Sequence, residues 1–93
     1  MTIRIDQRAS GELTVLEIGG WLEEEEVDEL ERVARAASRP LALDLSGLRS
    51  AGRRGVDSLR SLAGEGVELR SVPPFVRLLL ESRSGRSERG MNP

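Results

Sequence analysis

The segment LALDLSGLRSAGRRGVDSL, residues 41–59, contains the clearest change of hydrophobic period in the chain. Leucines alternate with other side chains in its first five residues, a pattern that predicts a buried strand. After a polar turn, Val56 and Leu59 have the spacing of a helix face. This helix opens on Arg53 and Arg54, although a helix start favours acids and each exposed cation there costs about 0.3–1 kcal/mol. The segment therefore predicts a strand–turn–helix unit with an unusual charge at the start of its helix.

The residues before this segment predict a strand hairpin and a long helix. Residues 3–6 have the two-residue period of a half-buried strand. Gly11 predicts a hairpin connection to a second, antiparallel strand over residues 13–18. The two glycines after residue 18 are expected to end the second strand. Residues 21–38 carry apolar side chains at helical spacing, and Pro40 ends this helix.

The residues after this segment predict one more strand and one more helix. The helix that opens on the arginines closes in AGEG, VELRSV forms a fourth strand, and PPFVRLLL begins a third helix that carries Phe75, Leu78 and Leu79. The resulting order, β-β-α-β-α-β-α, predicts an α/β fold with a mostly parallel four-stranded sheet and an N-terminal antiparallel hairpin. We expect one small domain over residues 1–81 and a disordered polar tail over residues 82–93.

The composition excludes most catalytic chemistry. The chain has 93 residues with no Cys and no His, so it lacks thiolates, disulfides and the commonest general base and metal ligand. The acidic run EEEE in the first helix is interpreted as helix electrostatics rather than as a metal or catalytic cluster, because acids favour a helix start. Asp28 with Arg32, and Glu31 with Arg35, have the spacing of ion pairs within one helix. We therefore expect no catalytic residue, no metal and no cofactor.

The charge and hydropathy of the chain point to neither nucleic acid nor membrane. All 14 basic residues are Arg, and 16 acidic residues give a net charge of -2, which offers no general attraction to nucleic acid or anionic lipid. The opening MTIRIDQRAS has no apolar run of signal-peptide length, and no segment approaches the ~20 apolar residues that span a bilayer. We expect a cytoplasmic protein without direct membrane insertion.

The turn after residue 45 lies where ligands and partners usually meet an α/β sheet, at the carboxyl end of a strand. It lacks the glycine and lysine pattern of a phosphate loop. Asp44 is expected to accept hydrogen bonds from the amides of the turn, Ser50 to cap the helix, and Gly52 to supply an unusual backbone conformation. An enzyme that uses Asp44 with Asp57 or Glu17 is an alternative interpretation of the same region.

The segments VLEIGGWL, LALDLSGLRSAGRRGVDSLRSLAGEGVELRSV and PPFVRLLL together resemble a STAS domain, the sulphate-transporter and anti-sigma-factor-antagonist family. The likeness covers residues 3–81. In that family the turn runs Asp-Leu-Ser-Gly-Val and, a few residues later, Asp-Ser-x-Gly opens the helix. The first part matches residues 44–47, and the last glycine matches Gly55. The family's Asp falls on Gly52, and the Ser that a partner kinase phosphorylates falls on Arg53, so the resemblance implies a fold and docking surface without the usual phosphoacceptor.

The resemblance implies a non-catalytic regulatory module, in a bacterial protein, that binds a regulatory protein such as an anti-sigma factor or a kinase-like protein. The partner-binding residues that we predict surround the start of the second helix: Ser50, Gly52, Arg53, Arg54 and Val56. The two arginines would favour an acidic patch or a bound phosphate on the partner. In the other interpretation they bend toward solvent or toward acids such as Asp57, and have no function.

Two further questions are left open by the residues. Ser50 precedes the helix and Ser58 lies more than one turn inside it, so neither is an obvious replacement for the phosphoacceptor. A second role for the same fold is a small cytoplasmic subunit of a bacterial membrane transport complex, which is a known use of free-standing STAS domains.

Overall fold

The computed structural model describes residues 3–89. The elements follow the predicted order, which is confirmed: β1 (Ile3–Ser10), β2 (Leu13–Leu22), α1 (Glu24–Ala36), β3 (Leu41–Ala51), α2 (Arg53–Gly64), β4 (Glu68–Arg70) and α3 (Pro74–Arg89). None of the helices in this described part is long and apolar enough to cross a membrane.

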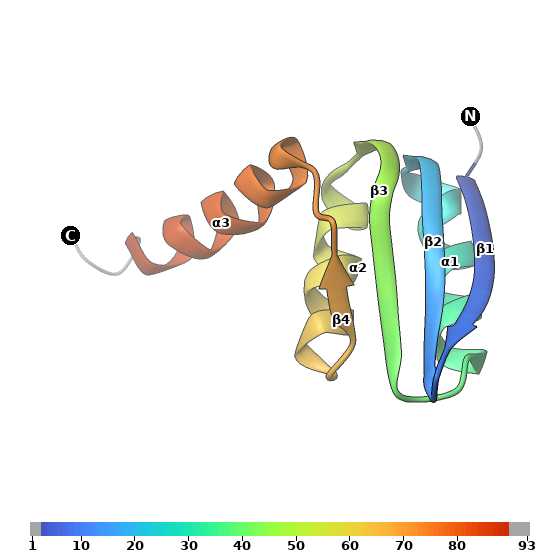
Figure 1. The fold of residues 1–93 in the computed structure, drawn as a ribbon. Coiled ribbons are helices and arrows are strands. Elements are labelled where there is room, and N and C mark those ends of the chain that lie inside the picture. The colour runs from blue at the N-terminus through green and yellow to red at the C-terminus, as the bar shows by residue number, and fades with distance from the viewer. Residues whose placement is uncertain (1–2, 90–93) are drawn as a thin grey trace.

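The four strands form one sheet in the order β1-β2-β3-β4. The β1–β2 hairpin is antiparallel, whereas β2 with β3 and β3 with β4 are parallel, as the α/β pattern predicts. Helices α1 and α2, which connect the parallel strands, lie side by side behind the sheet, and α3 projects away from it (Figure 1). The sheet thus has one face covered by helices and one face that no helix within residues 3–89 covers.

The hydrophobic core fills the space between the sheet and the two helices. Alternate positions of β2 and β3 point to this side, because successive side chains of a strand point to opposite faces. The residues that build this core from the strands and helices are Leu16, Ile18, Leu22, Leu41, Leu43, Leu45, Val27, Leu30, Ala34, Leu59 and Leu62. Glu17 and Asp44 lie at intervening positions of β2 and β3 and are register partners, and Asp6 of β1 is the register partner of Glu17, so all three acids lie on the open face.

Three strands are longer than the sequence predicts, and one is shorter. Strand β1 continues past residue 6 to Ser10, whereas β4 has three residues instead of the predicted 67–72. Gly19 and Gly20 lie inside β2 instead of ending it, and β3 continues from Leu45 to Ala51. The extensions of β2 and β3 pair with each other: Gly19 is the register partner of Gly47, with a register shift on either side. A Cβ built on Gly47 would lie 3.3 Å from the Gly19 Cα, so the absence of side chains lets the two backbones continue side by side.

The C-terminal helix begins at Pro74, one of the two prolines predicted to start it. Val76 is fully buried, whereas Leu78 and Leu79 are exposed. The helix continues to Arg89, into the segment predicted to be a tail, and residues 90–93 of that segment lie outside the described residues.

Candidate functional site

The start of α2 lies directly against the end of β2. The Gly52 amide donates a hydrogen bond to the Leu22 backbone oxygen at 3.0 Å, which ties the turn to the neighbouring strand. A Cβ at Gly55 would overlap that same oxygen and would lie 2.9 Å from Leu22 Cγ, so only glycine fits this helix position. Gly52 itself has φ -83, ordinary extended backbone, and the predicted unusual conformation is therefore wrong.

The predicted capping role of Ser50 is also wrong. Gly52 is the N-cap residue of α2, without a side-chain cap hydrogen bond. The Ser50 hydroxyl instead donates to Glu23 Oε2 at 2.8 Å. This bond holds the Glu23 carboxylate beside the helix start, where its Oε1 lies 3.8 Å from the position of a Cβ on Gly52. A carboxylate from the residue before α1 thus supplies the negative charge that the first turn of α2 lacks.

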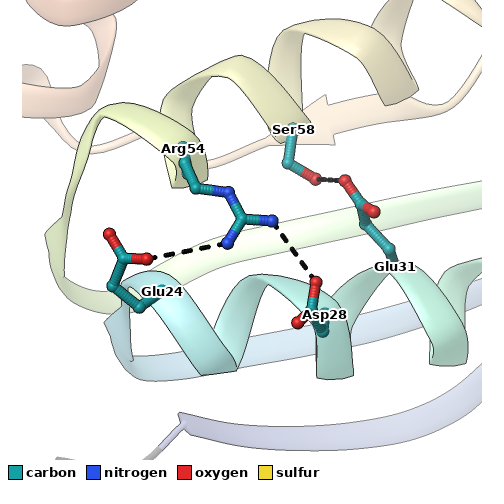
Figure 2. Close-up of polar contacts among 5 residues, drawn as sticks. All are labelled: Glu24, Asp28, Glu31, Arg54 and Ser58. Atoms are coloured by element: carbon teal, nitrogen blue, oxygen red, sulfur yellow. Dashed lines mark hydrogen bonds and ion pairs between the residues drawn. The ribbon is translucent and has the colours of Figure 1, made fainter.

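Three acids of α1, Glu24, Asp28 and Glu31, make contacts with α2. The Arg54 guanidinium lies 3.3 Å from Asp28 Oδ1 and 3.7 Å from Glu24 Oε1 (Figure 2). One turn further along, the Ser58 hydroxyl donates to Glu31 Oε2 at 2.8 Å, and both contacts point across the seam between the helices. We call the five residues drawn in Figure 2 the helix seam.

The helix seam replaces the ion pairs predicted within α1. Asp28 contacts Arg54 rather than Arg32, and Glu31 accepts from Ser58 rather than pairing with Arg35. Arg32 pairs instead with Glu29 at 2.6 Å. A signal for this arrangement exists in the sequence, because α1 carries a surplus of acids while the first turn of α2 carries only cations.

The five predicted partner-binding residues occupy different environments. Arg53 is exposed at the first position of α2, and Arg54 beside it is tied to α1. Val56 is 1% exposed, so its side chain lies in the interior and is not available for contact with a partner. Both arginines are exposed, and Arg54 is the one whose guanidinium contacts acids of α1.

The hydroxyls of Ser50 and Ser58 are poorly suited to carry a phosphate. Each donates to a carboxylate, Ser50 to Glu23 and Ser58 to Glu31. A phosphoryl group on either oxygen would replace that donor with a second anion against the same carboxylate. Ser58 is in addition only 4% exposed.

Asp44 accepts the predicted hydrogen bond, but it does so inside β3 and not in a turn. Its Oδ1 accepts from the Ser46 amide at 2.9 Å, and both residues belong to the strand, so the turn predicted after residue 45 is wrong. Hydrogen bonds from the Ser46 amide and hydroxyl hold the pKa of Asp44 below its ordinary value of 3.8, against a smaller opposing effect of burial. Asp44 therefore acts as an ionised hydrogen-bond acceptor for Ser46.

The proposed carboxylate pair of Asp44 and Glu17 lies together on the open face. The two residues are register partners on β2 and β3, and both line an open depression of about 480 Å³. Glu17 Oε2 lies 2.6 Å from Arg8 Nε in an ion pair. The lowered pKa of Asp44 favours the ionised form of that carboxyl. Acid–base catalysis needs one carboxyl of a pair to retain its proton, and this environment favours ionisation of Asp44. Asp57, the other suggested partner, lies on α2.

Comparisons with protein-family models and with curated proteins found no match for this chain. The STAS resemblance therefore stays a prediction, supported by the quoted residues.

Proposed function

We propose that this protein is a non-catalytic regulatory module of the STAS type that binds a protein partner in the cytoplasm. The partner is an anti-sigma factor or a related kinase-like protein, and docking uses the start of α2. Phosphorylation at the usual position does not control the interaction, because that position is Arg53.

The observation that carries this proposal is the contrast between the two arginines. Arg54 makes contacts with Asp28 and Glu24 that explain its presence at a helix start. Arg53 is exposed at the same helix start, where a cation opposes the helix dipole. A partner carboxylate or phosphate would turn this unfavourable position into a favourable one, because a guanidinium can form paired hydrogen bonds with such groups.

The surroundings of Arg53 support a docking role. It follows the carboxyl end of β3, the end of a parallel strand at which partners usually meet α/β sheets. The Glu23 side chain lies beside Gly52, so a partner would reach this helix start through the exposed Arg53 side chain. The hydrogen bonds of Ser50 and Gly52 hold this turn in place before a partner arrives.

Binding measurements with purified anti-sigma factors and related kinases of the same organism test the proposal. Titration calorimetry should detect binding to one of them, and Arg53→Ala and then Arg53→Glu should weaken it progressively. Arg35→Ala is the matched control, because Arg35 is also exposed but lies in the last turn of α1. Wild-type affinity of Arg53→Glu for its partner, or failure of every candidate to bind, would contradict the proposal.

A phosphorylation assay tests the second part of the proposal separately. Incubation with the partner kinase and ATP should leave the wild-type chain unlabelled. Arg53→Ser introduces a hydroxyl at the helix start and should become labelled. Label on the wild-type chain would show that another residue carries the switch.

A further inference from the structure

The outer edge of β1 is long and unpaired. All eight residues of β1 pair with β2, and β1 is the terminal strand of the sheet order. Its other side faces outward at the rim of the sheet, with no further strand of residues 3–89 beside it (Figure 1). Such an edge presents a row of free amides and carbonyls that can pair with another strand.

The opposite edge of the sheet is protected, and β1 is not. Strand β4 has only three residues, with Gly66 at φ +100 before it and Ser71 at φ 51 directly after it. Strand β1 contains no proline or lysine, and its register with β2 runs without a shift from Ile3 to Ser10. Short length, proline, bulges and charged side chains are the usual devices that prevent pairing at an edge. Strand β1 uses only the last of these, with Arg4, Asp6 and Arg8, so a second strand can pair with it where its own charges are complementary.

The two faces of this edge have distinct chemistry. Ile3 and Ile5 are only partly buried at the margin of the core, on the face covered by helices. Arg4 and Asp6 alternate with them and are exposed on the open face. A strand placed beside β1 would cover Ile3 and Ile5 on one face. On the other face it would meet the cation Arg4 and the anion Asp6, which are neighbours on that face.

Geometry restricts the way in which two copies of β1 can pair. In an antiparallel pair, opposed residues must both direct their backbone groups toward the partner or both direct them away. A symmetric pair is therefore centred on one residue, which opposes itself in the second copy. Centring on Ile5 places Arg4 of each copy opposite Asp6 of the other, with the two Ile5 side chains in contact across the axis.

The neighbouring registers are less favourable. Centring on Arg4 or on Asp6 opposes that residue to its own copy, so like charges face each other. Centring on Gln7 pairs Asp6 with Arg8, but Arg8 already binds Glu17 at 2.6 Å, and this register leaves Ile3 unpaired. The charges of β1 therefore select one register.

We propose that the chain forms a symmetric dimer through antiparallel pairing of two β1 strands about Ile5. The four-stranded sheets join into one continuous sheet, and the helices of both copies remain on the same face. The α1 helices, which lie behind β1 and β2, are then antiparallel across the axis (Figure 1). This arrangement directs the acidic first turn of one α1 toward the end of the other that carries Arg35.

Cysteine cross-linking measures the register directly, because the chain contains no Cys. Mild oxidation of Ile5→Cys should give a covalent dimer on non-reducing gels, since residues opposed across an antiparallel pair lie within disulfide reach. Gln7→Cys, which lies at the axis of the competing register, should cross-link far less. Efficient cross-linking of Gln7→Cys with none for Ile5→Cys would overturn the proposed register.

Charge reversal measures whether Arg4 and Asp6 hold the dimer together. The wild-type chain should sediment with twice the monomer mass, and Arg4→Asp or Asp6→Arg alone should lose the dimer. The double variant Arg4→Asp/Asp6→Arg restores opposite charges and should recover it, while circular dichroism confirms that each variant is folded. A monomeric wild-type chain at high protein concentration, or a dimer that survives either single reversal, would overturn the proposal and leave the edge to another partner or to water.

Discussion

Gly55 and the backbone oxygen of Leu22 lie so close that no side chain fits between them. The contact fixes α2 against the end of β2, and it sets the position of the turn that carries Arg53. The same oxygen accepts a hydrogen bond from the Gly52 amide, so one carbonyl anchors both the turn and the first turn of the helix. The geometry of the proposed docking surface therefore depends on a glycine that does not itself contact a partner.

Replacement of Gly55 by alanine should destabilise the fold. The new Cβ would overlap backbone, which cannot move as the tip of a side chain can, and overpacking of this kind costs about 1–3 kcal/mol. Urea unfolding followed by circular dichroism measures the loss. Gly64→Ala is the matched control, because nothing lies within 4 Å of a Cβ at that end of the same helix. Equal unfolding free energies for the two variants would contradict the close contact.

Arg54→Ala should lower stability slightly, and Arg53→Ala should not. Replacement of Arg54 removes two ion pairs between α1 and α2. Arg54 is half-exposed and both of its acidic partners are mostly exposed, and surface pairs of this kind contribute about 0.2–1 kcal/mol. The difference between the two variants should shrink in high salt, because salt screens exposed charges. Urea unfolding at low and high ionic strength measures this difference in unfolding free energy. A larger loss for Arg53→Ala would show that Arg53, rather than Arg54, connects the helices.

The sequence predicts local structure well here and tertiary charge contacts poorly. Periodicity, with glycine and proline as breaks between segments, places the seven elements in order, because β2, β3, α1 and α2 each bury one face. The local spacing rule paired Asp28 with Arg32, yet the structure pairs Asp28 with Arg54, 26 residues away. The extra length of β2 and β3 was missed for a related reason, since Gly19 and Gly47 stay extended only because they pair with each other. Both features require the packed arrangement of distant segments, which no local pattern contains.

Asp44 should make the fold more stable at neutral pH than in acid. Its pKa is lowered in the folded protein, so the ionised form stabilises the fold above the ordinary value of 3.8. This contribution is lost as the pH falls through the lowered pKa of the folded state. Asp44→Asn keeps an acceptor for the Ser46 amide but cannot ionise, so it should be less stable than wild type at neutral pH by about 0.5–1.5 kcal/mol.

Unfolding free energies of both chains across the acidic range measure this difference. The two curves should converge at low pH, where Asp44 of the wild-type chain is protonated. Glu12→Gln removes a carboxylate from the exposed β1–β2 turn and controls for the loss of one negative charge. A constant gap between wild type and Asp44→Asn at all pH values would exclude a contribution from ionisation.

Ser58→Ala should be the most costly of the conservative changes in the helix seam. Ser58 is 4% exposed and its hydroxyl donates to the Glu31 carboxylate, and hydrogen bonds to charged groups contribute about 1.5–3 kcal/mol. Ser61→Ala makes the same change on the same helix at an exposed position, where surface substitutions stay within about 0.5 kcal/mol. Urea unfolding of both variants compares the two serines. Because the bond joins α1 to α2 within the fold, its loss should reduce stability without changing partner affinity at temperatures where the variant stays folded. Equal stability of the two variants would contradict this prediction. It would mean that water replaces the Ser58 hydroxyl as a hydrogen-bond donor to Glu31 at no cost in stability, and that the ion pairs of Arg54 are sufficient to join α1 to α2.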